Sequence, residues 1–234
     1  MNLIEEIFKI LFEKYGPQYW WPADSSFEVI IGAILTQATN WNNVEKAIAN
    51  IKNKKLLDPD KLYYISLEKL EDLIRPCGFY KIKARRIKNF LDFLFKSYDG
   101  KLDKISKETT FLLREKLLSI SGLGKETVDS ILLYAFNRPV FVIDNYTRKI
   151  FSCLGILEFS LSYEQWQSLF QNFLFPIYQL FNEYHALIVE HGKRKCKLCK
   201  GSCFIKERVF SENFQFYYKE YLQLRNKSRF HPAT

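Results

Sequence analysis

The spacing of the apolar residues constrains this chain more than any other feature. Apolar side chains recur every three or four residues, first at Leu3, Ile4, Ile7, Ile10 and Leu11. This spacing places them on one face of a helix. Ser25 and Glu28 open the next apolar segment with the spacing of a capping box, a signature of helix N-termini. Few segments alternate with period two, so the sequence predicts an all-α fold.

Similar periodicity continues along the chain and predicts most of the remaining helices. The expected helical segments are residues 42–52, 67–74, 82–96, 110–118, 127–136, 146–153, 163–173 and 179–190. Internal repeats and low-complexity linkers are absent from the sequence. We therefore expect helices joined by short connections.

A Gly-Leu-Gly turn, Gly122 to Gly124, separates two of these segments. Glycine tolerates positive φ and carries no Cβ to keep a ligand away from the backbone. The start of the next helix offers unpaired N–H groups and partial positive charge, to which Lys125 adds. The turn is therefore either a phosphate-binding clamp or simply the cap between two helices.

Asp144 follows the short apolar segment 140–143 and precedes another helical segment. An aspartate in this position is a good helix N-cap. A carboxylate at the end of a buried segment is also a candidate catalytic group. The residue alone supports both interpretations.

Taken together, these motifs resemble the endonuclease III superfamily of DNA glycosylases. That family combines a helix-hairpin-helix motif, a Gly-Pro-rich loop and an aspartate. The residues that carry the resemblance are Leu117, Ile120, Gly122, Gly124 and Thr127, then 142–144, 32–39, 78–84, and His191-Gly192 ahead of three cysteines. They occur in the family's order over nearly the whole chain.

The resemblance implies two helical lobes with a DNA-binding cleft between them. Residues 25–139 would form a helical barrel domain, with the helix-hairpin-helix at about 112–136. Residues 1–24 and 140–234 would form the second domain, which carries Asp144 and a degenerate cysteine cluster. The sequence without the resemblance does not predict this discontinuous arrangement.

The resemblance also assigns residues to DNA binding and catalysis. A glycosylase must flip its target nucleotide out of the stack, and Gln37 is the expected wedge. The other expected DNA contacts are Lys83, Gly122, Leu123, Gly124, Lys125 and Thr127. Asp144 would stabilise the positive charge that develops on the sugar and would orient or deprotonate the attacking water.

Glu126 separates two branches of the family. Bifunctional members carry a lysine at this slot, whose amine attacks the sugar and allows strand cleavage. The spacing from Glu126 to Asp144 matches the family, and the neighbouring Lys125 would point elsewhere because consecutive helical residues diverge. We therefore expect a monofunctional glycosylase.

The segment 20–22, Trp-Trp-Pro, resembles the 3-methyladenine DNA glycosylases of this superfamily, as do the stretches 35–37, 75–80 and 122–126. The expected base pocket consists of Trp20, Trp21, Pro22, Trp41 and Glu126. Aromatic faces attract a cationic alkylated purine. The alternative is that the tryptophans simply pack between the lobes.

The charge balance favours an anionic partner. The chain has 35 Lys and Arg against 26 Asp and Glu, a net charge of +9. Residues 81–88 and 193–208 form two basic clusters, which are either solvated faces or contacts to a phosphate backbone. We expect damaged double-stranded DNA as the partner, and a monomeric protein.

The five cysteines favour a reducing compartment over a disulfide framework. The family's iron-sulfur cluster uses four cysteines, whereas Cys196, Cys199 and Cys203 have different spacings and Val209 occupies the fourth position. We expect a degenerate site and no cofactor required for the chemistry. A three-cysteine cluster with an outside ligand and a zinc site completed by His191 are the alternatives.

Apolar runs are too short to span a membrane, and the N-terminus lacks the pattern of a signal peptide. We therefore expect a cytoplasmic protein.

Two other functions are compatible with the sequence. One is a bifunctional pyrimidine-damage glycosylase with lyase activity, which Glu126 disfavours. The other is a helix-hairpin-helix DNA-binding protein without catalysis, in which Asp144 is only a cap.

Overall fold

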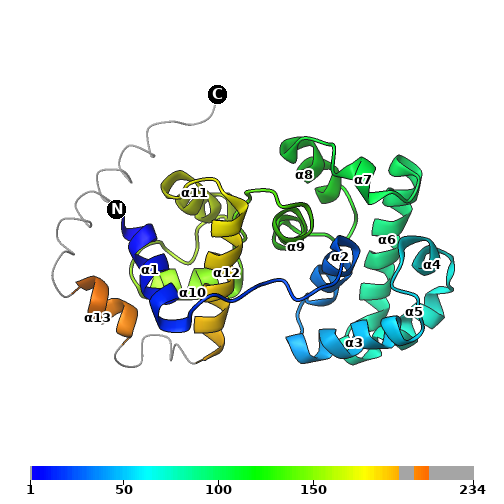
Figure 1. Ribbon diagram of the computed structural model, residues 1–234, viewed down its shortest axis with the longest axis horizontal. Helices are drawn as coiled ribbons and strands as arrows, with labels where there is room; N and C mark the ends of the chain where they lie inside the picture. Colours follow the sequence, from blue (N-terminus) through cyan, green and yellow to red (C-terminus); the bar gives the residue numbers. More distant parts are fainter. Residues whose placement is uncertain (1, 195–202, 211–234) are drawn as a thin grey trace. The chain divides into compact units, whose positions relative to one another are not determined.

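The computed structural model describes residues 2–194 and 203–210, and every regular element in these ranges is helical (Figure 1). This confirms the all-α prediction. The elements are α1 (Leu3–Tyr15), α2 (Ser26–Leu35), α3 (Trp41–Asn53), α4 (Pro59–Tyr64), α5 (Leu67–Ile74), η1 (Arg75–Cys77), α6 (Tyr80–Tyr98), α7 (Leu102–Ile105), α8 (Thr110–Leu118), α9 (Lys125–Ser130), η2 (Ile131–Ala135), α10 (Asn145–Cys153), α11 (Tyr163–Phe173), α12 (Tyr178–Lys193) and α13 (Phe204–Phe210).

The chain divides into two compact units. Residues 20–142 form the central unit, which contains α2 to η2. Residues 1–19 and 143–234 form the discontinuous unit, which contains α1 and α10 to α13. The sequence placed the middle domain at residues 25–139.

The central unit is organised around α2. Every residue of this helix from Phe27 to Leu35 is buried, because the helix packs against α3, α6, α9 and η2. A helix that is apolar on all sides is stable only inside a core. The expected capping box is half present, since the Ser25 hydroxyl accepts from the Glu28 N–H. The Glu28 carboxylate accepts instead from the Asp24 N–H at 2.9 Å.

The discontinuous unit joins the N-terminal helix to the C-terminal half of the chain. Helix α1 lies beside α12 (Figure 1), and it also packs against α11 and α13. The buried Tyr184 hydroxyl donates to the Ile4 carbonyl at 2.8 Å. The Tyr184 ring also packs edge to face against Phe8 and Phe170. These contacts give residues 1–19 a place in a core formed more than 120 residues later in the chain.

Gly192 allows close packing inside the discontinuous unit. A Cβ at this position would lie 2.2 Å from the Tyr146 ring. The glycine of the His191-Gly192 pair therefore lets the end of α12 approach the start of α10, where Asp144 is the N-cap. Any larger side chain would force the Tyr146 ring or one of the two helices to shift.

Candidate functional site: a glycine hairpin, an aromatic pocket and a capped aspartate

The two glycines of the hairpin have different roles. Gly122 adopts a φ of 93°, and a Cβ there would lie 2.5 Å from the Arg86 Cγ. Gly124 has an extended backbone with a φ of −87°, and nothing lies within 4 Å of its Cβ position. Leu123 between them is buried and anchors the turn. Only Gly122 needs the conformational freedom that the sequence predicted for both glycines, whereas Gly124 leaves open space before α9.

Helix α9 begins at Lys125 without a side-chain cap, and Gly124 is its N-cap residue. The first N–H groups of a helix have no acceptor within the helix. Together with the open space at Gly124, these groups form a surface that an anion can approach. The geometry is compatible with the phosphate clamp expected from the sequence.

Gln37 is bound to the hairpin. Its side-chain amide donates to the Thr127 hydroxyl at 2.8 Å and to the Gly122 carbonyl at 3.2 Å. Its amide oxygen accepts from the Arg86 guanidinium. Three expected DNA-binding residues and one residue of the first basic cluster therefore form one network within the central unit.

Lys83 lies inside the central unit, although the sequence placed it at the DNA surface. Its side chain is 1% exposed, and the ammonium donates to the Cys77 carbonyl at 2.8 Å. Burial lowers the pKa of Lys83. This buried amine holds the turn before α6 and is shielded from a phosphate backbone.

Phe79 is a surface residue that sequence reasoning did not select. It adopts a φ of 46° at the N-cap of α6, and its side chain is 69% exposed. Positive φ is uncommon for a bulky residue and marks a constrained turn. The buried ammonium of Lys83 supports this turn through Cys77. The Gly78-Phe79-Tyr80 motif is part of the family resemblance, but the sequence does not reveal that the Phe79 ring faces solvent.

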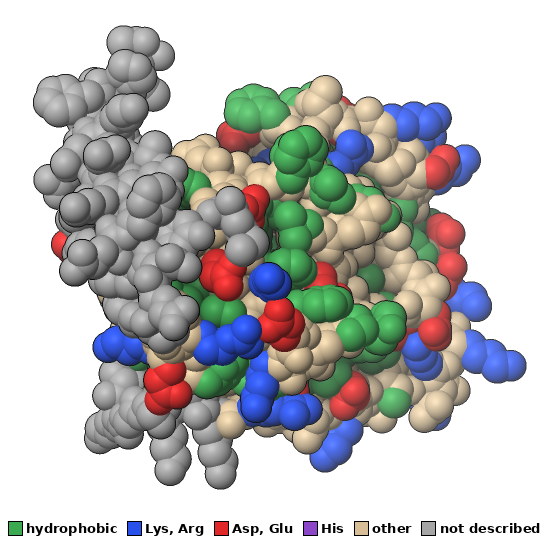
Figure 2. All heavy atoms as spheres, turned by 60° about the vertical axis from the view of Figure 1, so that its left-hand side comes forward, with side chains coloured by type: hydrophobic (Ala, Val, Ile, Leu, Met, Phe, Trp, Pro, Cys, Tyr) green, Lys and Arg blue, Asp and Glu red, His purple; other side chains and the backbone are tan. Residues whose placement is uncertain are grey.

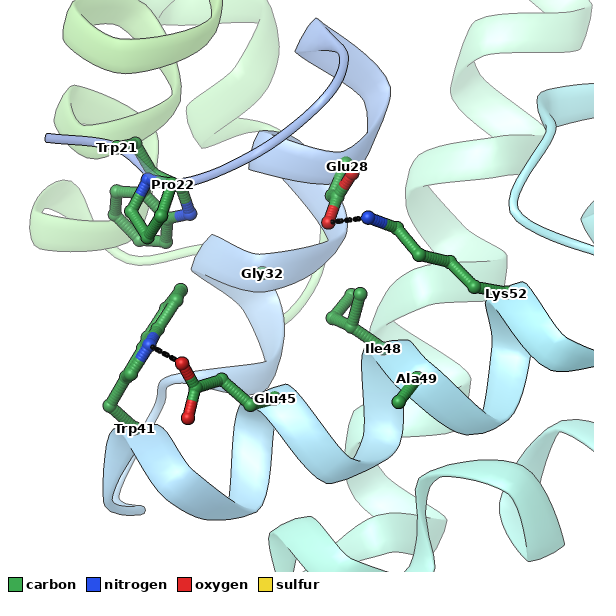
Figure 3. Close-up of a pocket in the computed structure, with 9 residues that line it drawn as sticks. All are labelled: Trp21, Pro22, Glu28, Gly32, Trp41, Glu45, Ile48, Ala49 and Lys52. Carbon is green, nitrogen blue, oxygen red and sulfur yellow. Dashed lines mark hydrogen bonds and ion pairs between the residues drawn. The ribbon is translucent and has the colours of Figure 1, made fainter.

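Three residues of the expected base pocket line one cavity of the central unit. Trp21, Pro22 and Trp41 lie at one end of this pocket (Figure 3). The other residues that line it are Glu28, Gly32, Glu45, Ile48, Ala49 and Lys52. The pocket has a volume of about 200 Å³, which is below the usual range for sites of drug-sized ligands.

The tryptophans are held by close contacts. The Trp21 and Trp41 rings meet edge to face, with centroids 5.3 Å apart. A Cβ on Gly32 would lie 3.3 Å from Trp21, so the glycine lets this ring lie against α2. Trp20 does not line the pocket and packs against Trp21 and Tyr134. Aromatic packing therefore fixes the pocket before any ligand arrives.

Glu126 lies outside the lining of this pocket, in the first turn of α9, where it is exposed. The sequence placed it in the base pocket with the tryptophans. Helix position explains the difference, because the pocket is built between residues 21–22, α2 and α3. Glu126 lies just after the hairpin turn, at the position where the family resemblance expects the lysine of bifunctional members.

Charged side chains line the rest of the pocket. The Glu45 carboxylate accepts from the Trp41 indole N–H at 2.8 Å. The Glu28 carboxylate pairs with the Lys52 ammonium at 2.6 Å, and Lys52 also binds Asp24 at 2.8 Å. The hydrogen bonds that the ammonium donates to Asp24 and Glu28 raise the pKa of Lys52. The ammonium is therefore charged and compensated by two carboxylates.

Asp144 is both a helix cap and an accessible carboxylate of the discontinuous unit. Its Oδ1 accepts from the backbone N–H and the hydroxyl of Thr147, both at 2.7 Å. The Tyr163 hydroxyl accepts from the Ile143 N–H at 3.2 Å and fixes the preceding residue. The Asp144 side chain is 13% exposed. The cap uses one oxygen, so capping and catalysis are compatible.

His185 lies next to Asp144, and the sequence analysis did not select it. Its Nε2 is 3.8 Å from the Asp144 Oδ2, and its side chain is 6% exposed. Burial lowers the pKa of His185, and the Asp144 carboxylate opposes this shift. The aspartate therefore faces a neutral imidazole at neutral pH. His185 belongs to no motif within α12, so the sequence gives no signal for this role.

The cysteine cluster lies largely outside the described residues, since Cys196 and Cys199 are not among them. Cys203 is a free, half-buried thiol, and Val209 is buried on α13. The His191 Nδ1 is bound to the Tyr15 hydroxyl at 2.8 Å. Within residues 2–194 and 203–210, no group of three His, Cys, Asp or Glu residues is arranged to hold a metal. These residues alone do not build the family's cluster site.

The surface charge is mixed where it can be seen. On the face drawn in Figure 2, Lys and Arg side chains lie among carboxylates and apolar side chains. Within the described part of the chain, no helix is long and apolar enough to cross a membrane.

Comparisons with known proteins identify the family. Residues 31–175 match the model of the HhH-GPD superfamily base excision DNA repair proteins. A protein of Methanocaldococcus jannaschii, named as a DNA repair glycosylase, is 46% identical over 216 residues, which cover 90% of this chain and 97% of the relative. Endonuclease III of Thermotoga maritima is 30% identical, with coverage of 87% and 91%.

Solved structures agree with this assignment. The 3-methyladenine DNA glycosylase of H. pylori, bound to 1,N6-ethenoadenine, matches with a TM-score of 0.71 and 32% identity over 83% of this chain and 98% of that one. An endonuclease III–DNA covalent intermediate has the same fold, with a TM-score of 0.71 and 20% identity over 82% and 86% of the two chains. The chain therefore belongs to the HhH-GPD superfamily of base excision DNA repair proteins, as a DNA glycosylase.

Proposed function

We propose that this glycosylase is monofunctional and removes cationic alkylated purines, such as 3-methyladenine, from duplex DNA. The observation that carries the proposal is the pocket of Trp21, Pro22 and Trp41, with carboxylates on its walls. Aromatic faces attract cations, and tryptophan does so most strongly. The H. pylori relative, named as a 3-methyladenine DNA glycosylase, supports an adenine-type base.

Asp144 supplies the chemistry in this proposal. Cleavage of an N-glycosidic bond develops positive charge on the sugar, which a nearby carboxylate stabilises. The Asp144 Oδ1 is held by Thr147, so its Oδ2 is the oxygen available to the sugar or to the attacking water. A cationic base is already a good leaving group, so one carboxylate suffices. The hydrolysis requires no cofactor.

Flipping the nucleotide requires contacts to the backbone and a group that fills the gap. The hairpin amides would hold phosphate at Gly124, where the backbone is open. Gln37 is already bound to Gly122 and Thr127, so it must release these bonds to enter the stack. Phe79 is exposed and needs no such release. We therefore propose Phe79 as a second wedge in addition to Gln37.

Glu126 is the reason for proposing hydrolysis without strand cleavage. The covalent lyase route needs an amine that attacks the sugar, and a carboxylate cannot form that Schiff base. The neighbouring Lys125 starts α9 one residue earlier and so points in a different direction. Borohydride reduction tests this point, because a lyase becomes covalently attached to DNA. We expect no such adduct with the wild type and its damaged substrate.

A base-release assay tests the proposed function. The protein is incubated with duplex DNA treated with a methylating agent, and the released bases are separated by chromatography. We expect 3-methyladenine in the released fraction and strand breaks only after alkali. Breaks without alkali on oxidised pyrimidines would support the bifunctional alternative. Tight binding without release of any base would support the binding-only alternative.

A further inference from the structure

Helix α3 places a tryptophan and a carboxylate side by side on the pocket wall. The Asn40 side chain caps α3 by accepting from the Asn43 N–H at 3.1 Å, which makes Trp41 the first helical residue. Glu45 follows four residues later and therefore lies on the same face. Figure 3 shows the Glu45 carboxylate directed toward the Trp41 indole and away from Ile48.

The hydrogen bond between these residues fixes the ring and changes its electrostatics. The Trp41 Nε1–H donates to Glu45 at 2.8 Å. Bonds to an ionised acceptor are roughly twice as strong as neutral ones. The bond holds the indole edge to face against Trp21 and places negative charge at its rim. Both effects make the Trp41 face more attractive to a cation.

The other charged wall of the pocket is already compensated. Lys52 is bound to Glu28 at 2.6 Å and to Asp24 at 2.8 Å, so two carboxylates compensate its positive charge. Within the described residues, Glu45 has no ion-pair partner, and its one hydrogen-bond donor is the neutral indole. The negative charge of Glu45 is therefore available to a ligand in the pocket.

We infer that Glu45 is a specificity-determining residue, which makes the pocket prefer a cationic base over a neutral base of the same shape. This inference rests on the proposed function, because it takes the pocket of Trp21, Pro22 and Trp41 as the base site. It assigns shape recognition to the aromatic rings and charge recognition to Glu45. The preference should weaken at high salt, since screening shortens the reach of an exposed charge.

Direct binding of two small probes tests the inference without DNA. The cationic probe is 3,9-dimethyladeninium, and the neutral probe is 9-methyladenine. Both are titrated into the full-length protein while tryptophan fluorescence is recorded. Glu45→Gln keeps an acceptor for the indole N–H and removes the charge. Glu68→Gln is the matched control, because it removes an exposed carboxylate of α5 outside the pocket.

We expect the wild type and Glu68→Gln to bind the cation more tightly than the neutral probe. Glu45→Gln should reduce this preference roughly threefold to tenfold, with unchanged affinity for the neutral probe. An unchanged preference in Glu45→Gln overturns the inference and leaves the pocket assignment in place. A wild type that binds neither probe overturns both the pocket assignment and the inference.

Discussion

Two carboxylates of this protein accept hydrogen bonds from their own helices, yet their surroundings differ. Asp144 is 13% exposed, caps α10 and faces the buried His185 in the discontinuous unit. Glu45 is exposed on α3 and accepts from an indole at the rim of an aromatic pocket in the central unit. A partly buried carboxylate interacts more strongly with a nearby charge than an exposed one, because water and salt screen the exposed group. In the two proposals, Asp144 of the discontinuous unit serves the chemistry and Glu45 of the central unit serves recognition of the base.

The largest effect should come from Asp144→Asn. Removing the charge should lower the single-turnover rate of base release roughly a hundredfold to a thousandfold, the usual cost of losing one electrostatic stabiliser. The amide oxygen still accepts from Thr147, so the thermal midpoint should stay close to the wild-type value.

A capping control separates chemistry from stability. Ser162 caps α11 in the same unit, and its hydroxyl accepts from the Gln165 N–H at 3.2 Å. Ser162→Ala should lower stability by about 1 kcal/mol and leave the rate unchanged. Full activity in Asp144→Asn would assign Asp144 to capping alone and remove the contrast with Glu45.

Trp41→Ala should produce the next largest effect. Base–aromatic stacking contributes about 1–3 kcal/mol per base, so removal of cationic lesions should slow roughly tenfold to a hundredfold. Kinetics on a duplex with a single alkylated adenine measure this loss. Tyr64→Ala is the control, because Tyr64 is an exposed aromatic residue of the same unit outside the pocket. Equal rates for the two variants would exclude Trp41 from recognition.

The hairpin glycines allow a test within three residues. Gly122→Ala should lower the free energy of unfolding by about 1–3 kcal/mol, because the new methyl group meets Arg86 and φ is positive. Gly124→Ala should change stability little, since its φ of −87° suits alanine and this gain offsets the weaker capping of α9 by alanine.

Gly124→Ala should nevertheless weaken binding to undamaged duplex DNA, because its methyl group stands in the open space before the amides of α9. Urea unfolding and fluorescence anisotropy measure the two properties. Unchanged DNA binding in a stable Gly124→Ala protein would mean that the turn is a cap and not a phosphate clamp.

The smallest effect concerns His185 and pH. Burial lowers the pKa of His185 in the folded state. The unfolded chain therefore takes up a proton, near pH 6.5, that the folded protein does not, so stability is lost as pH falls through that value. The free energy of unfolding should decline more steeply between pH 7.5 and pH 5.5 in the wild type than in His185→Gln. Parallel curves from urea unfolding would show that Asp144 does not face a neutral imidazole.

The sequence predicted the helices and the hairpin because both have local signals. The spacing of apolar residues predicted α5, α8 and α11 with the same bounds as in the structure. The two glycines of the hairpin turn can be read directly from the sequence. The short helices α4 and α7 were not predicted, since six and four residues are too few to show a period. Local pattern is sufficient where local interactions decide the structure.

Side-chain environment was much harder to predict. Lys83 belongs to a basic cluster in the sequence, yet its ammonium is buried against Cys77. His185 and Glu45 belong to no motif. The partner of His185 is Asp144 from a distant segment, and the partner of Glu45 is Trp41, one helical turn before it. The burial of a side chain and its partners depend on tertiary packing between segments far apart in the chain, which local sequence patterns do not reveal.

The most direct test of the account is a single-turnover comparison of two duplexes, one with a cationic alkylated adenine and one with an oxidised pyrimidine. Each reaction is divided and run on a denaturing gel with and without alkali. We expect cleavage of the alkylated duplex only after alkali, no cleavage of the oxidised duplex, and loss of the signal in Asp144→Asn. Strand cleavage of the oxidised duplex without alkali would contradict the account.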